Sequence, residues 1–110
     1  MKQTASPGSF EQLDLRIGRV IAVAEALTRK PTYRLSIDFG PELGTKISCG
    51  AYRNYRADEL VGRLVVAVVN LGPKKMGPET SDVLVLGVTA AGGTIFLTTE
   101  SDVPVGAQVS

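Results

Sequence analysis

Residues 33–39 alternate strictly between apolar and polar side chains, and no other feature of the sequence limits the fold as much. Apolar side chains occupy the odd positions from Tyr33 to Phe39, and polar ones occupy the even positions between them. A period of two residues is typical of a β-strand, whose successive side chains point to opposite faces. The segment therefore predicts a strand with one buried face and one polar face.

Other strands are indicated by runs of β-branched and apolar residues between turn residues. They are predicted at residues 16–27, 45–50, 64–71, 82–89 and 94–99, with a hairpin turn at 90–93. Within the first run, Gly18 would permit a bend or a bulge. A short helix is predicted at 58–61, and a helical turn capped by Ser9 at 10–13. About five strands with one short helix between the third and fourth predict an all-β fold, a small closed or partly open antiparallel barrel.

The strands at 64–71 and 82–89 have no polar face. In a small barrel one face of every strand points outward, so the outer face of these two strands needs a cover. The extended C-terminal segment, a second subunit or an apolar ligand could supply it, and a homodimer is the commonest solution. We therefore expect a flexible tail at 1–9 and a single domain at 10–110 that ends in a dimerisation extension. The predicted dimer interface consists of Leu84, Leu86, Val103 and Val105.

The composition indicates binding and argues against catalysis. The chain has one cysteine and no histidine, which removes the commonest general base and a cysteine-based zinc cage. The carboxylates are scattered, so we expect no catalytic residues, no metal and no cofactor. No apolar run approaches the roughly 18 residues of a membrane span, and the N-terminus lacks a signal peptide. The sequence therefore predicts a cytoplasmic protein without membrane insertion.

Charge is distributed unevenly, although the formal net charge is only +1. Residues 29–56 contain six basic and two acidic side chains, whereas residues 77–110 contain four acidic side chains and no basic one. Such asymmetry predicts a basic face on a nearly neutral molecule.

The best candidate for a contact site is the segment 73–78. Lys74, Lys75 and Met76 lie between two prolines; the lysines suit phosphates or acidic peptides, and a methionine adapts to varied apolar partners. The alternative is a solvated strand connection.

Three weaker candidates have plain structural alternatives. Tyr52, Arg53 and Tyr55 could stack on bases or on a peptide, or pack the helix onto the barrel. Cys49 could be a nucleophile, but a lone cysteine without a histidine is more typical of a buried apolar residue. Residues 40–46 have the wrong glycine spacing for a phosphate loop and predict a turn.

Taken together, four stretches resemble the tRNA-binding-domain family, and within it the CsaA-type protein-export chaperones. They are LDLRIGRVIAVAEA, YRLSIDFG, YRADELVGRLVVAVVNL and KKMGPETSDVLVLGV, and the resemblance covers about residues 10–110. It implies a five-stranded OB-fold barrel with one short helix between strands 3 and 4 and extended terminal segments. It further implies a homodimer that binds unfolded or precursor polypeptides, with the export translocation ATPase as a further partner. The alternative ligand is tRNA, bound by its structure and not by its sequence.

Two departures from the family pattern matter: the first favours the chaperone branch, and the second, at residues 48–55, prevents the transfer of ligand roles from CsaA-type chains to that segment. The tRNA-binding relatives read Lys-Met-Arg-Gly and a serine three residues later; here Lys75, Met76 and Ser81 match, but Gly77 replaces the arginine and Asp82 adds negative charge. Residues 48–55 also differ from the Ser-Ala-Gln-Ile-Thr of CsaA-type chains. The predicted peptide- or RNA-binding residues are Arg34, Lys46, Arg53, Tyr55, Lys74, Lys75, Met76 and Ser81.

Overall fold

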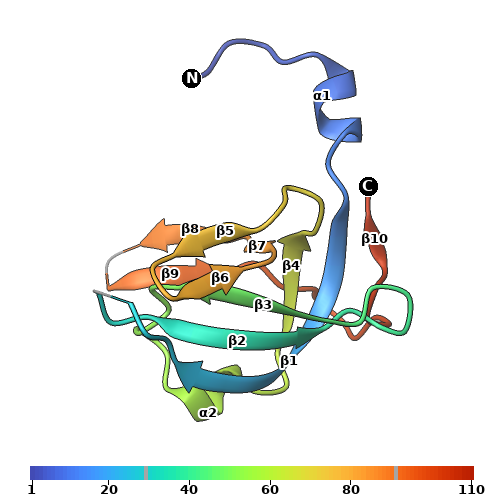
Figure 1. Ribbon diagram of the computed structural model, residues 1–110. Coiled ribbons are helices and arrows are strands. Elements are labelled where there is room, and N and C mark those ends of the chain that lie inside the picture. Colours follow the sequence, from blue (N-terminus) through green and yellow to red (C-terminus); the bar gives the residue numbers. More distant parts are fainter. Residues whose placement is uncertain (29, 91) are drawn as a thin grey trace.

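The computed structural model of the chain describes residues 1–28, 30–90 and 92–110. Arg29 of the basic segment and Ala91 of the predicted hairpin turn lie outside the described residues. Five strands form an antiparallel barrel wall in the order β3-β2-β1-β4-β7 (Figure 1). They are β1 (Leu15–Glu25), β2 (Tyr33–Asp38), β3 (Thr45–Gly50), β4 (Leu64–Val68) and β7 (Leu84–Val85). The predicted all-β barrel of the OB-fold type is confirmed.

Strand β1 joins the two halves of the barrel wall because it pairs with different neighbours along its length. Its first residues pair with β4, in register Ile17 opposite Val66, and its last residues pair with β2. A register shift between Val20 and Ala22 lets the strand bend. The bulge therefore does not lie at Gly18, which instead leaves room for the core: an added Cβ there would stand 2.6 Å from Phe39 Cε1.

Two apolar clusters stabilise the barrel. The inner cluster fills the barrel and includes Leu35, Ile37 and Phe39 of the alternating segment. The outer cluster consists of Leu15, Ile17, Leu64, Val66 and Val68, and it is covered by Leu86, Val103, Val105, Ala107 and Val109. Strand β10 (Gln108–Val109) then pairs with the start of β1. Of the predicted covers for the outer face, the C-terminal segment supplies much of it within the same chain.

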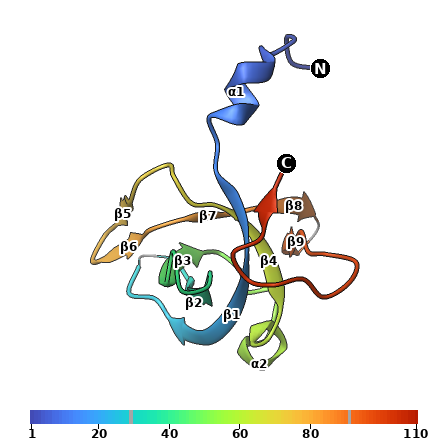
Figure 2. The same cartoon turned by 90° about the vertical axis from the view of Figure 1, so that its right-hand side faces the viewer.

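Both helices are short. Helix α2 (Ala57–Leu60) lies between β3 and β4, as predicted, and buries Leu60. Helix α1 (Pro7–Glu11) begins three residues before the predicted turn, with Ser6 and not Ser9 at its N-cap. It projects away from the barrel beyond β1, beside the C-terminus, and has no buried residue (Figures 1 and 2). Neither helix is long and apolar enough to cross a membrane, and the described residues contain no other.

Two hairpins extend from the barrel wall, and they change two predictions. The segment 73–78 is not an irregular loop, because β5 (Lys74–Met76) pairs with β6 (Glu79–Ser81). The segment 82–89 is not one strand: it divides at Leu86 into β7 and β8 (Gly87–Ala90), which pairs with β9 (Gly93–Phe96). The close approach at Gly87, where a Cβ would stand 2.5 Å from Thr94 Cγ2, lets the chain leave the wall. Figure 2 shows the two hairpins on opposite sides of the barrel.

Candidate ligand-binding face

The β5–β6 hairpin is built by a two-residue turn. Met76 pairs with Glu79, so Gly77 and Pro78 are the central residues, and Gly77 has a φ of +65°. A positive φ at the first position and the fixed negative φ of proline at the second are what a type II′ hairpin turn requires. The turn therefore explains why this chain has glycine and proline where an arginine and a glycine were expected.

Side chains, and not a backbone ladder alone, join this hairpin to the free edge of β3. The Cys49 N–H donates to Ser81 Oγ at 3.1 Å, and the Ile47 N–H donates to Asp82 Oδ2 at 2.9 Å. Ser81 also donates to the Val83 carbonyl at 3.1 Å, and the Asp82 N–H donates to the Ile47 carbonyl at 2.7 Å. We call this junction the seam. It satisfies backbone groups that an edge strand would otherwise leave unpaired.

Glu79 fixes the other side of the hairpin. Its carboxylate is nearly buried and accepts the Leu27 N–H at 2.8 Å and the Arg34 guanidinium at 3.0 Å. The hydrogen bond from Leu27, together with Arg34, holds the pKa of Glu79 below its ordinary value, against the opposing effect of desolvation. The hairpin is thus tied to the β1–β2 connection as well as to β3.

These contacts assign structural positions to several of the predicted site residues. Ser81 is buried in the seam and Arg34 is paired with Glu79. Asp82 binds a backbone N–H in the seam, so its charge is engaged there. Lys46 lies on β3 opposite Ile37, partly exposed.

Tyr52 and Tyr55 pack against the barrel, which is the second of the two alternatives considered for them. Tyr55 stacks on Phe96 with the ring centroids 5.3 Å apart and accepts the Phe96 N–H at 3.2 Å. Tyr52 meets Phe96 edge-on at 4.8 Å. Arg53 pairs with Glu25 and lies over the Tyr33 ring, 4.7 Å from its centroid. Neither Tyr52 nor Tyr55 is therefore displayed as an open stacking platform.

Two pockets flank the hairpin, and Met76 lines both. The outer pocket has a volume of about 850 Å³ and is mainly apolar; it is lined by Leu27, Thr28, Lys30, Thr32, Ala51, Met76, Gly77 and Pro78. The seam pocket has a volume of about 420 Å³; it is lined by Ser48, Cys49, Tyr52, Leu71, Gly72, Pro73, Lys74, Met76, Ser81, Val83 and Leu84. Leu27 and Leu71 were not predicted as site residues, because a single apolar residue in a connection carries no periodic signal.

Positive charge lies at the rim of these pockets. Lys74 and Lys75 are exposed on β5, and neither has a carboxylate within ion-pair distance in the part of the chain that the structure describes. Lys30 lines the outer pocket and Lys74 the seam pocket. The face therefore combines apolar cavities with lysines that remain available to a ligand.

Cys49 is buried in the wall of the seam pocket. Burial is the main cause that raises the pKa of its thiol, and Glu79 adds to the effect. A protonated thiol is a poor nucleophile, so the arrangement favours the structural alternative over a reactive cysteine.

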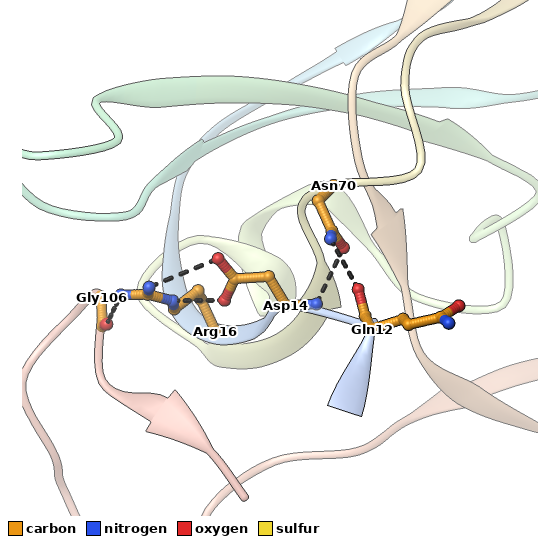
Figure 3. Close-up of polar contacts among 5 residues, drawn as sticks. All are labelled: Gln12, Asp14, Arg16, Asn70 and Gly106. Atoms are coloured by element: carbon orange, nitrogen blue, oxygen red, sulfur yellow. Dashed lines mark hydrogen bonds and ion pairs between the residues drawn. The ribbon is translucent and has the colours of Figure 1, made fainter. Parts of the chain in front are cut away.

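Two of the stretches that carry the family resemblance, at residues 14–18 and 68–70, meet at the start of β1 (Figure 3). Asn70 accepts the Asp14 N–H at 2.8 Å and donates to the Gln12 carbonyl at 2.9 Å. Arg16 pairs with the Asp14 carboxylate at 2.6 Å and donates to the Gly106 carbonyl at 3.1 Å. The motif residues therefore fix both terminal segments to the barrel.

Of the four predicted dimer-interface residues, three pack on the same cluster and Leu84 lies apart. Leu86, Val103 and Val105 pack on the outer cluster. Leu84 is half exposed and lines the seam pocket.

An antiparallel five-stranded barrel, with pockets at the β1–β2 and β4–β7 connections, is the architecture of the OB-fold class. A family model described as "Putative tRNA binding domain" matches residues 15–108. The chain therefore belongs to the tRNA-binding-domain family, and the resemblance of the sequence to it is confirmed.

Two solved structures and one relative compared by sequence extend this likeness. The chaperone CsaA of Bacillus anthracis is 40% identical, with a TM-score of 0.90 over 98% of this chain and 100% of that one. The CsaA chaperone of Picrophilus torridus is 33% identical, with a TM-score of 0.92 over 97% and 100%. The methionine–tRNA ligase of Archaeoglobus fulgidus is 35% identical over 98% of this chain, but the chain spans only 16% of that ligase.

Proposed function

We propose that this protein binds unfolded or precursor polypeptides as a cytoplasmic, non-catalytic homodimer of the CsaA type, in support of protein export. The observation that carries the proposal is the pair of pockets on either side of Met76, with lysines at their rim. An extended polypeptide could place apolar side chains in both pockets. The likeness to CsaA chaperones supports the proposal, because it spans the whole length of those chains.

The physical properties of the face suit varied polypeptides. Met76 is partly buried between the pockets, and its unbranched thioether can repack around different side chains. Lys74 and Lys75 attract acidic groups without demanding a fixed geometry. The type II′ turn and the Glu79 contacts hold the hairpin in place, so little order has to be gained on binding.

A homodimer is part of the proposal, and the export translocation ATPase is a proposed further partner. Phe10 of helix α1 and Leu13, which follows the helix, are exposed. A second subunit would cover these side chains together with Val103 and Val105. Sedimentation at micromolar concentration tests this point, and a monomer would contradict it.

Polypeptide binding is tested with a labelled, permanently unfolded model protein and fluorescence anisotropy. Met76→Ala should weaken binding, because it removes a wall shared by both pockets. Val61→Ala is the matched control, since Val61 is equally apolar, half exposed and outside both pockets. Equal affinity of the two variants would overturn the role of the hairpin.

A second candidate function is tRNA binding, which the family model favours. OB-folds bind oligonucleotides on the same face, and Lys30, Lys46, Lys74 and Lys75 could contact phosphates. If all four do so, raising the salt from 50 to 200 mM should weaken binding about 50- to 150-fold through counterion release. Filter binding with bulk tRNA measures this dependence. Absence of binding at low salt would reject the function.

A further inference from the structure

The wall of the seam pocket contains a pair of buried hydroxyl groups. Ser48 Oγ and Tyr52 Oη lie 3.2 Å apart, and the two residues are 1% and 7% exposed. The Tyr52 ring reaches Ser48 by lying across Gly50, where an added Cβ would stand 2.4 Å from Tyr52 Cζ. The pair therefore depends on local residues in the segment 48–55, where the chain departs from CsaA-type sequences.

One of the two hydroxyl protons of this pair has no acceptor within the pair. Two hydroxyls carry two O–H donors, and the bond between them uses one. Within residues 1–28, 30–90 and 92–110, neither oxygen has another hydrogen-bond partner. The pair thus offers the pocket one donor, and it also retains free lone pairs that can accept.

The surroundings determine which ligand can use this donor. The other walls include the apolar side chains of Leu71, Pro73 and Val83. A charged ligand group would lose its hydration against these apolar walls, and Lys74, which also lines the pocket, is exposed.

We propose that the seam pocket binds the uncharged carboxamide of a glutamine side chain. The carboxamide oxygen accepts the free hydroxyl proton, its NH₂ group donates to a remaining lone pair, and its methylenes lie against the apolar walls. A glutamate would bring a charge and a norleucine would leave the donor unpaired, so both bind less tightly. The inference rests on the proposed function only in taking a polypeptide as the source of the side chain.

The test uses three capped single residues as probes: the N-acetyl methylamides of glutamine, glutamate and norleucine. Amide NMR titrations of the full chain give a Kd for each probe. The amide signals of Ser48, Gly72 and Ser81 report binding in the pocket, and that of Gly62 is the reference outside it. The glutamine probe should shift the pocket signals and bind about tenfold more tightly than the norleucine probe. Equal or weaker binding of the glutamine probe, or shifts outside the pocket, would overturn the proposal.

A double variant separates the hydroxyls from the shape of the pocket. Ser48→Ala with Tyr52→Phe removes both hydroxyls and leaves apolar groups of similar shape, an exchange that a fold tolerates well. The preference for glutamine over norleucine should vanish, while norleucine binding persists. A preference that survives in the folded double variant would refute the role of the pair. The anisotropy assay with unfolded protein is independent, so polypeptide binding can fail while the pocket holds, and the reverse.

Discussion

Ser81 matches a family motif and was predicted to contact the ligand, yet its side chain lies in the seam. Replacing it with alanine tests whether the residue acts through the fold. Ser81→Ala removes the acceptor of the Cys49 N–H and the donor to the Val83 carbonyl, both at 3.1 Å. Because Ser81 and Cys49 are both buried, water can replace these bonds only poorly.

The expected loss in the free energy of unfolding follows from these two hydrogen bonds. A buried donor left unpaired costs about 1–3 kcal/mol, and the lost bond to the carbonyl contributes about 1 kcal/mol. We therefore expect the free energy of unfolding to fall by about 2–4 kcal/mol. At a urea slope of about 2 kcal/mol per molar, the midpoint falls by about 1–2 M.

Urea unfolding at one fixed protein concentration is the assay, since a homodimer would make stability depend on concentration. Thr80→Ala is the matched control, because Thr80 is exposed on the same strand and should cost no more than about 0.5 kcal/mol. If the two variants were equally stable, Ser81 would not hold the seam, and a direct contact with the ligand would become the better account.

Three other outcomes are expected. Gly50→Ala should lower the free energy of unfolding by about 1–3 kcal/mol through overpacking against Tyr52, as urea unfolding would show; an unchanged midpoint would contradict the observed packing. The folded-state pKa of Glu79 is lowered, so its stabilisation is present above its unfolded pKa and is lost as the pH falls through the folded pKa. The stability difference between the wild type and Glu79→Gln should therefore shrink on acidification, and a difference that is constant with pH would oppose this. The pKa of the Cys49 thiol is raised in the folded protein. Its alkylation rate should therefore increase with pH around a higher midpoint in the folded protein than in the urea-unfolded chain. Equal midpoints would argue for an exposed thiol.

The barrel could be predicted because its strands follow simple patterns. The alternation in residues 33–39 reports a half-buried strand directly, and β2 spans Tyr33–Asp38. The apolar run at 82–89 was harder to interpret. Such a run predicts that both faces are covered, but β8 is exposed along its length. The run also does not show where the chain changes partners, and here β7 ends at Val85 and β8 begins at Gly87.

The hairpin was predicted as a loop because strands of three residues are too short for a period to emerge. The signal that could have found it was the pair Gly77-Pro78, which suits a type II′ turn between short strands. The predicted contact segment 73–78 borders both pockets. The partners of Ser81 and Glu79, however, lie 32 and 52 positions away, and no local pattern reports such distant hydrogen bonds.

The seam also bears on how such a protein can change over generations. Because Glu79, Ser81 and Asp82 hold the hairpin through their own side chains, its attachment does not depend on the exposed side chains of Lys74 and Lys75. Substitutions at these two positions would alter what the hairpin presents and leave both its attachment and its turn intact. The surface of the hairpin can thus change in charge and shape while the barrel stays the same.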